Sequence, residues 1–520
     1  MIWHIFKKDV RLTWHLVAVA AGLHWLTAIL ATIVLNNFFE LKSPPLAVLL
    51  LGGLVARGVA IMAVVQHDPI PGVSQDWLVR PIRRRDLLLA KLLFVVLMVQ
   101  LPGFLADIGA SLASGFSFSL SFNAAVQHSV LQLLIINIPL LAFASITRNF
   151  LDVLSGGVLI GLVAGIVLGL TPASPYLTPV WRTGLSWILT ATACAVLVIG
   201  AGMVLGLQYF RRRTRASRLL TGCITGLLLI AQFMPWGPVF AFQRSLASAP
   251  GSSRDIALNF DPSAGRYKPP AGSLTEEDAL SVLKHNDQAF DIYLPFLVTG
   301  LPADSGIGTD HSEVRLIEPN GRVERLELGR WNLRPGAADS PVGPVYPKLE
   351  IPAVLYQRIR NQPVRLEVDH WLTFVQLSSS HFLPAIDGHQ QIPAVGRCGT
   401  TINSGETAVR LSCIEAGTPA TCLSYFLEHT PTGTRNPERF GCGTYSPLDM
   451  NTVVPISLTA FGANLLFRDA AGLTKFPIDG SKLGESRVVI QIYNVKDHFA
   501  RKLVIPEIRL SEWEAERPAQ

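Results

Sequence analysis

The sequence predicts a multi-pass α-helical membrane domain of about seven spans, followed by an all-β, sandwich-like domain outside the cytoplasm. Three observations predict this fold class. Long apolar runs fill the first half, basic residues gather in alternate loops between them, and the second half changes to two-residue alternation. A mean hydropathy of +0.36 with only 16% charged residues agrees with a membrane protein.

Charge divides the chain in the same place. Up to Phe242 there are 17 Lys and Arg residues against 7 Asp and Glu, and from Gln243 onward there are 27 against 31. The basic residues of the first half lie in short loops between apolar runs, where the cytoplasmic side of a bilayer favours them. No nucleic-acid-binding motif accompanies them, so the expected partner is the lipid bilayer and not nucleic acid.

Seven apolar segments have about the length needed to cross the hydrocarbon core. They are Thr13–Leu35, Leu46–Val65, Leu87–Leu112, Ser129–Ile146, Val153–Leu170, Leu185–Tyr209 and Leu219–Phe242. The fourth contains Asn137 and Pro139, and the fifth is short and rich in Gly, so this pair can also form a re-entrant hairpin. The first segment is longer than the apolar region of a cleavable signal and is expected to remain as an anchor.

The loop charges predict the orientation. Fourteen basic residues lie before the first span or in the loops after the second, fourth and sixth, whereas the remaining loops hold only Lys42 and Arg182. Because cytoplasmic loops are enriched in Lys and Arg, the N-terminus is expected in the cytoplasm. Seven crossings then place the C-terminal half on the periplasmic or extracellular side of an inner or plasma membrane.

The second half is expected to hold two β-rich modules. The predicted organisation is a permease-like membrane domain over 1–242, a linker over 243–272, a first module over 273–380 and a second over 381–520. A capping box predicts a short helix over Leu274–His285. Pro319-Asn320-Gly321 between two alternating segments predicts a hairpin. Further strands are expected at Phe290–Val298, Val364–Leu377, Ala408–Ile414, Thr421–Leu427, Val453–Phe461, Val488–Tyr493 and Leu503–Leu510.

Four of the six cysteines lie in the half placed outside the cytoplasm. Cys398, Cys413, Cys422 and Cys442 form an even set in one stretch, as expected for disulfides in an oxidising compartment. Three pairings are possible. A zinc site is the competing interpretation, but the four contain no C-x-x-C pair, so no metal site is expected.

The loop after the second predicted span combines aromatic, proline and basic residues. It contains Asp76, Trp77, Arg80, Pro81, Arg83, Arg84, Arg85 and Lys91, and it leads directly into the third span. Such a segment is expected to lie at the membrane interface, with Trp77 in the lipid and the arginines at the headgroups. It can transmit a push from a cytoplasmic partner, or it can act only as an anchor.

The motif Trp-Leu-x-Arg-Pro-Ile-x-Arg-Arg followed by Leu-Leu-x-Ala-Lys resembles the corresponding loop in permease subunits of type 2 ATP-binding-cassette exporters. The opening Ile5-Phe6-Lys7-Lys8-Asp9-Val10-Arg11 is similar to their amphipathic N-terminal helix. The resemblance covers about the first 240 residues. It implies a homodimer, or a heterodimer with another permease, worked by a separate cytoplasmic ATPase that binds ATP and contacts this loop. Such permeases usually have six spans and lack a large C-terminal domain.

Two ionisable residues lie inside predicted spans. Arg57 is midway along the second span and Asp107 lies in the third. Ionisable groups in hydrocarbon cost at least about 2.5–3.5 kcal/mol each, so they tend to face a partner or water. They either pair with each other, or Asp107 reaches the outer interface while Arg57 snorkels or meets another helix. His24 is expected to be a packed helix-contact residue.

Enzyme signatures are missing from the sequence. It contains no G-x-x-x-x-G-K-[ST] loop, so the chain supplies no P-loop ATPase of its own, and it contains neither H-E-x-x-H nor G-x-S-x-G. No cofactor is expected in this chain. We therefore expect the membrane subunit of an export system. The alternative is a non-transporting, membrane-anchored β-sandwich protein for sensing, adhesion or assembly.

Overall fold

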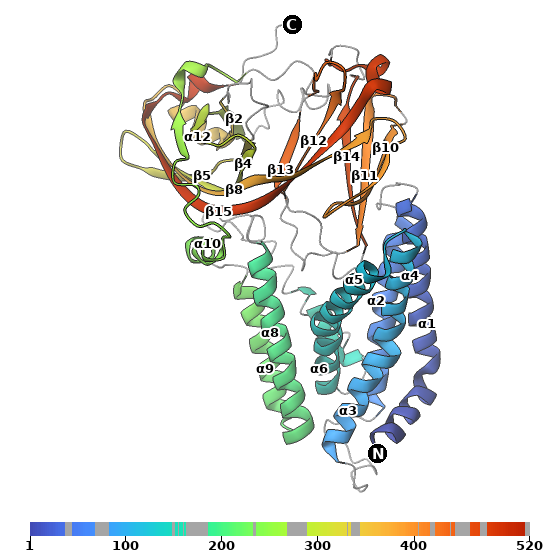
Figure 1. Ribbon diagram of the computed structural model, residues 1–520. Coiled ribbons are helices and arrows are strands. Elements are labelled where there is room, and N and C mark those ends of the chain that lie inside the picture. The colour runs from blue at the N-terminus through green and yellow to red at the C-terminus, as the bar shows by residue number, and fades with distance from the viewer. Residues whose placement is uncertain are drawn as a thin grey trace.

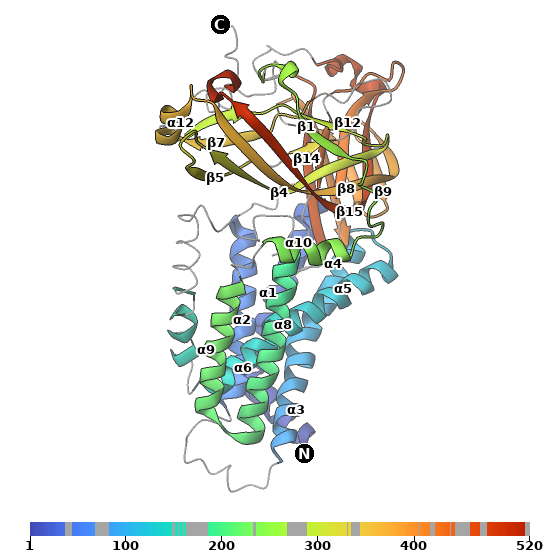
Figure 2. The ribbon, with the colours of Figure 1, turned by 90° about the vertical axis from the view of Figure 1, so that its left-hand side faces the viewer.

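The structure is a computed structural model of the 520-residue chain. It describes residues 1–36, 44–67, 83–147, 151–153, 155–159, 161–162, 186–231, 236–267, 289–329, 331–333, 344–403, 405–416, 422–436, 438–442, 458–468 and 476–514. Figures 1 and 2 show a helical half and a β half, with the β half seated on one end of the helical bundle and the N-terminus at the opposite end.

The helical half contains long apolar helices, three of which include a π-helical segment. The elements are α1 (Ile2–Asn36), α2 (Pro44–Gln66), α3 (Arg84–Phe94), η2 (Val95–Gln100), α4 (Leu101–Ala113), α5 (Phe118–Gln132), η3 (Leu133–Asn137), α6 (Ile138–Ile146), α8 (Ser186–Gly206), η6 (Leu207–Arg211), α9 (Thr214–Ala231) and α10 (Trp236–Ser245). Within the described ranges, 5 helices are long and apolar enough to cross a membrane, or up to 6 if α9 and α10 count as one span. The predicted multi-pass helical half is therefore confirmed.

Two of the seven predicted spans need comment. Val153–Leu170 lies mostly outside the described residues. Leu219–Phe242 is not one straight span, because α9 ends at Ala231 and α10 is bent from it by 85°. Packing explains the bend: Trp236 and Phe240 of α10 lie against aromatic residues of the β half, so α10 lies across the end of the bundle (Figure 2).

The β half is built from antiparallel strands. A 7-stranded sheet has the order β13 (Arg439–Cys442), β12 (Cys422–His429), β15 (Ser486–Ile508), β8 (Val364–Pro384), β4 (Ser305–Ile317) and β5 (Val323–Glu327), with β6 (Asn332–Leu333) also paired to β4. A 4-stranded sheet has the order β14 (Leu458–Leu466), β11 (Ala408–Ala416), β10 (Gly396–Ile402) and β9 (His389–Ile392). Two-stranded sheets join β1 (Ala257–Phe260) to β3 (Phe296–Thr299), and β2 (Ala289–Tyr293) to β7 (Lys348–Pro352). A short helix, α12 (Ala353–Ile359), follows β7.

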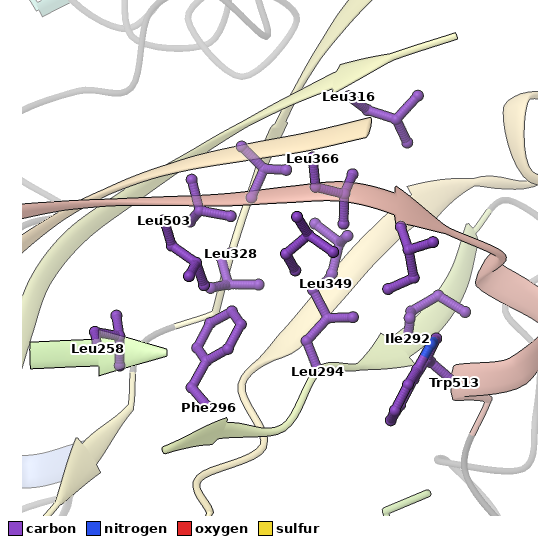
Figure 3. Packing of buried hydrophobic residues seen from close by; sticks show 14 of the residues in the cluster. Leu258, Ile292, Leu294, Phe296, Leu316, Leu328, Leu349, Leu366, Leu503 and Trp513 are labelled. Atoms are coloured by element: carbon purple, nitrogen blue, oxygen red, sulfur yellow. The ribbon is translucent and has the colours of Figure 1, made fainter. Parts of the chain in front are cut away.

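Two hydrophobic cores lie between these sheets. The first places Leu316, Leu366 and Leu503 of the long sheet against Leu258, Phe296 and Leu349 of the two-stranded sheets (Figure 3). The second places Leu427 and Val488 of the long sheet against Val409 and Leu411 of the 4-stranded sheet. Apolar faces of facing sheets therefore bury each other, as in a sandwich.

The boundary between the two predicted modules needs correction. We expected a seam at 380, but β8 continues unbroken to Pro384, and β15 pairs with it over almost its whole length. Both strands contribute to both cores. The cores are therefore joined by shared strands and are not separated by a linker. The predicted linker at 243–272 is also partly wrong, since Ile256 and Leu258 are buried in the first core.

Most predicted strands are present, with changed bounds. The hairpin at 319–321 is confirmed, because β4 and β5 pair across it and Gly321 has a φ of 82°. The strand expected at Phe290–Val298 is two strands, β2 and β3. The two strands expected at Val488–Tyr493 and Leu503–Leu510 are one strand, β15. The helix expected at Leu274–His285 lies outside the described residues.

Candidate functional site

A chain of polar side chains crosses the interior of the helical half. His24 lies on α1, Arg57 on α2, Asp107 on α4, and His128 and Gln132 on α5. Their exposed fractions are only 2, 4, 2, 6 and 2%. Burying ionisable groups between apolar helices is costly unless they are hydrogen-bonded to one another, and intramembrane ionisable groups of this kind mark functional sites.

Along this row of polar side chains each group donates a hydrogen bond to the next, from Arg57 to Asp107. Arg57 Nη1 donates to Gln132 Oε1 over 2.7 Å, Gln132 Nε2 donates to His128 Nε2 over 3.0 Å, and His128 Nδ1 donates to an Asp107 oxygen over 2.5 Å. Because arginine can only donate, it fixes the orientation of the Gln132 amide, and the amide in turn makes His128 Nε2 an acceptor. Arg57 and Asp107 are thus joined through two side chains of α5 instead of directly.

Arg57 is held on its other side by His24, which its Nη2 contacts. The space for this contact depends on a glycine. A Cβ atom at Gly103 would lie 2.7 Å from Arg57 Nη2 and 3.2 Å from His24 Nε2. Glycine at position 103 therefore permits the close approach of α4 to the guanidinium group. The Asp107 carboxylate also acts on Arg57 electrostatically. His24, predicted as a packed helix-contact residue, is buried and contacts the Arg57 guanidinium group.

Two π-helical segments adjoin this polar chain. η2 carries Gln100 and η3 carries Asn137, and Asn137 Nδ2 donates to Gln100 Oε1 over 2.6 Å. Gln100 Nε2 in turn donates to the backbone oxygen of Ser129 over 3.2 Å. π-Helical turns are rare and occur frequently at functional sites. Here they meet in two neighbouring helices at a buried polar contact.

A second buried polar contact lies nearer the N-terminal end of the bundle. Lys91 Nζ donates to Asp9 Oδ2 and to the backbone oxygen of Val64, both over 2.8 Å. The exposed fractions of the two side chains are 1 and 0%. Lys91 was expected in the contact loop for an ATPase. Its burial excludes it from such a surface, and it instead ties α3 to α1 and α2.

The remaining loop residues are only partly described. Asp76, Trp77, Arg80 and Pro81 lie outside the described residues. Arg83, Arg84 and Arg85 are exposed at the start of α3. Arg84 Nη1 donates to the backbone oxygen of Phe210 over 2.7 Å.

This bond brings two basic segments together. Beside the start of α3 lies the turn between α8 and α9, whose Arg211, Arg212 and Arg213 are exposed. We call residues 83–85 and 211–213 together the basic surface. It lies at the end of the bundle opposite the β half (Figure 1). Sequence reasoning treated the two segments separately.

The helical half contacts the β half in two places. At the first, Ala106, Ala110 and Phe116 share a buried cluster with Ile414 and Leu458 of β11 and β14. Arg397 Nη1 adds a 3.1 Å hydrogen bond to the backbone oxygen of Ser114. The end of α4 is therefore attached to the 4-stranded sheet.

The second contact is the docking of α10 on the long sheet. The Trp236 ring lies 4.9 Å from the His311 ring and 6.0 Å from the Trp371 ring, measured between ring centroids. Gln243 contacts the His498 ring at 3.1 Å, and His498 Nδ1 lies 2.9 Å from Thr373 Oγ1. These side chains are buried or half-buried at the junction between α10 and the long sheet.

The cysteines of the β half form two pairs. Cys398 bonds Cys413 between β10 and β11, and Cys422 bonds Cys442 between β12 and β13. Each pair is in register across neighbouring antiparallel strands, with Cα atoms 4.0 Å apart. This selects one of the three possible pairings. Throughout the ranges that the structure describes, no group of three or more His, Cys, Asp and Glu residues could hold a metal ion.

Two histidines of the β half, His311 and His370, lie close to each other and to aromatic residues. His311 stacks on Trp371, and His370 is fully buried, with Nδ1 2.7 Å from Ser312 Oγ. Burial lowers the pKa of His370 to about 3, and the neighbouring His311 lowers it further in the same direction. His370 is therefore a neutral core residue at physiological pH.

Comparison with protein-family models and with curated proteins gives no match to this chain. The class of protein therefore rests on the architecture. The chain is a multi-pass helical membrane protein with a β-rich C-terminal half that contains two disulfides.

Proposed function

We propose that this chain is the membrane subunit of an ATP-binding-cassette export system, working as a dimer with a separate cytoplasmic ATPase. The observation that carries the proposal is one continuous helical segment, Arg84–Ala113, of 30 residues. It begins at the basic surface, passes the buried polar chain at Asp107, and ends at the contact with the β half. At 1.5 Å per residue it is about 45 Å long.

This helix offers a direct mechanical route. The ATPase binds the loop at 76–82 together with Arg83, Arg84 and Arg85, and ATP-driven closure displaces the start of α3. The buried Lys91–Asp9 contact passes that displacement to α1 and α2. Displacement of α4 then reaches the β half, which receives or releases the cargo.

The proposed topology places the basic surface in the cytoplasm and the β half outside it. Disulfides in the β half suit an oxidising compartment. The positions of Ile146 and Ile188 also support seven spans. Ile146 bonds Arg218 near the basic surface, whereas Ile188 packs against Val239 and Phe240 of α10, beside the β half. The chain therefore leaves Ile146 near the basic surface and is at the other end of the bundle by Ile188, which is the change of side that the predicted span at Val153–Leu170 requires.

The test is affinity purification of the full chain in mild detergent, followed by mass spectrometry. We expect an ATPase to co-purify with the wild type and to be lost from the double variant Arg83→Glu, Arg84→Glu. The matched control is Arg322→Glu with Arg325→Glu, at exposed positions of the β4–β5 hairpin. Equal capture by all three proteins, with insertion unchanged, would rule out coupling through the basic surface.

A reporter fusion tests the topology independently. Alkaline phosphatase fused after Gln520 is expected to be active, because it folds only outside the cytoplasm. Activity of a cytosolic reporter at the same position would contradict the proposed orientation.

The second candidate function is a non-transporting, membrane-anchored β-sandwich protein. The observation that favours it is the firm docking of α10 on the long sheet, which suits a fixed display of the β half. This function predicts that no ATPase co-purifies with the wild-type chain under the same conditions.

A further inference from the structure

We propose that one face of α10 binds the phospholipid headgroup layer and so anchors the β half to the leaflet beside it. This face is turned away from the long sheet and carries Pro238, Ala241, Phe242 and Ser245, and the chain continues from it to Leu246. We call these five residues the underside of α10. The inference requires only that the helical half spans a membrane, and it does not depend on export or on an ATPase.

The two faces of α10 have different surroundings. Trp236, Val239, Phe240 and Gln243 recur at helical spacing and pack against the long sheet or the first turn of α8. The residues of the underside recur on the opposite side of the same helix, and all of them are exposed. The described part of the protein therefore covers one face of α10 and leaves the other open.

The position of α10 relative to the bundle indicates what meets the open face. α9 ends at Ala231, and α10 is bent from it by 85°, so α10 runs along the surface of a bilayer that the bundle spans. Ile188, in the first turn of α8, packs against Val239 and Phe240, so α10 lies at the level where α8 begins. Figure 1 shows α10 beside the top of α8, outside the bundle and beneath the long sheet. Its underside therefore lies over the surrounding lipid.

The underside has the side chains of an interfacial helix. Phe242 and Leu246 have exposed fractions of 53 and 58%, and the other three residues are smaller. Helices that lie in the headgroup layer bury their apolar side about 5–10 Å toward the acyl chains. The indoles of Trp187 and Trp236 pack in the cluster at the same level, and tryptophan is enriched at the interface between membrane and water.

Arg244 supplies a positive charge beside the underside. It is exposed in the last turn of α10, and among the described residues it forms no ion pair with a carboxylate. Burial lowers the pKa of Arg501, and the positive charge of Arg244 lowers it further, so the two guanidinium groups are neighbours. Arg501 already donates to the backbone oxygens of Ser253 and Arg254, and the Asp497 carboxylate already accepts from Ser253. Arg244 is therefore open to an external anion, and a lipid phosphate is the anion found at this level.

A phospholipid fits this surface better than a soluble anion or a protein partner. A soluble anion would neutralise Arg244 but would leave Phe242 and Leu246 in water. A protein partner would have to displace the headgroups that lie directly beneath α10. A phospholipid brings an anionic phosphate and an apolar layer together, in the order in which the sheet, Arg244 and the underside follow one another.

The experiment measures the depth of spin labels on the full chain in lipid nanodiscs. Cys194 and Cys223 are first replaced by Ser, and single labels are placed at Phe242→Cys and Leu246→Cys. Relaxation by oxygen reports contact with hydrocarbon, and relaxation by a water-soluble nickel chelate reports contact with water. The reference for lipid is Ile199→Cys, at a 64% exposed position of α8, and the reference for water is Val323→Cys, at a 50% exposed position of the β4–β5 hairpin.

We expect the ratio of oxygen to nickel relaxation at both labels to shift away from the Val323 reference and toward the Ile199 reference. In nanodiscs that contain phosphatidylglycerol, Arg244→Glu should move the ratio at Leu246 back toward the water reference, because like charges repel. The matched control Arg322→Glu, on the distant hairpin, should leave it unchanged. An unchanged ratio at Ile199 in the Arg244→Glu variant shows that insertion is intact.

Three results would overturn the inference. Nickel relaxation at both labels equal to that of the Val323 reference would place the underside in water. Protection from both reagents would show that protein covers it, either a second copy of the chain or another segment. A ratio at Leu246 that Arg244→Glu does not change would exclude the phosphate contact. Co-purification of an ATPase is measured separately, so the proposed function stands or falls independently of these results.

Discussion

Lys91 and Asp9 form an ion pair in which the ammonium nitrogen lies 2.8 Å from the carboxylate, although 82 residues separate them in sequence. Both side chains are buried between α1 and α3, and the same ammonium group also bonds the Val64 backbone in α2. One lysine therefore connects the first three helical elements of the chain.

We expect Lys91→Met to reduce the free energy of unfolding by about 3–5 kcal/mol, because it leaves the Asp9 carboxylate buried without its counter-charge. The double variant Asp9→Asn, Lys91→Met should recover much of this loss, since no charge then remains buried. Thermal unfolding of the purified chain in detergent measures both. Strictly additive losses in the double variant would show that the two residues do not act as a pair.

Gly103→Ala is expected to destabilise the chain by about 1–3 kcal/mol. The new methyl group would lie 2.7 Å from Arg57 Nη2 and would displace the guanidinium from His24 and Gln132. Gly53→Ala on α2 is the matched control, because a Cβ atom at that position meets no atom within 4 Å. Equal unfolding temperatures for the two variants would contradict a close approach at Gly103.

Removal of either disulfide should weaken the β half. Cys398→Ala with Cys413→Ala opens a link with a sequence separation of 15 residues, and we expect a loss of about 3 kcal/mol. Thiol labelling of the denatured wild type should modify only Cys194 and Cys223 until a reductant is added. Labelling of all six cysteines without reductant would show that the β half does not meet an oxidising compartment.

Glu415 should make stability depend on pH. Burial raises the pKa of this carboxyl group from its usual value of 4.5 to about 7 in the folded chain. Between these values the folded state holds a proton that the unfolded state has lost, so stability falls as pH rises from about 4.5 to about 7 and is constant above. The slope for one proton is at most about 1.4 kcal/mol per pH unit.

Glu415→Gln has no ionisable group at this position and should lose less stability than the wild type over that range. Chemical unfolding at a series of pH values measures the difference. Glu406→Gln, at an exposed position of the same module, is the control and should follow the wild type. Parallel pH profiles for all three proteins would contradict an inward-facing, protonated Glu415.

The helical half was predictable in outline because hydrocarbon imposes a length on every apolar segment. The fourth segment shows where that reasoning stops. We predicted a start at Ser129, but the helix begins at Phe118, and the polar residues His128 and Gln132 lie in its buried interior. They stand four residues apart, a spacing that places both on one helix face, so this signal was present in the sequence.

The partners of Arg57 and Asp107 could not be predicted in the same way. The sequence places both charges in apolar segments, but the choice of partner depends on how four helices pack. The cysteine pairing is a similar case. Cys398 meets Cys413 because β10 and β11 are in one particular register, and spacing along the chain does not specify it.

The long strands β8 and β15 connect the two cores of the β half. Each is more than twenty residues long, and their shared ladder passes through both cores. The two hydrophobic cores are therefore joined by one continuous antiparallel pair of strands. Because α4 contacts the 4-stranded sheet and α10 contacts the long sheet, the packed sheets of the β half connect the two places at which it meets the helical half.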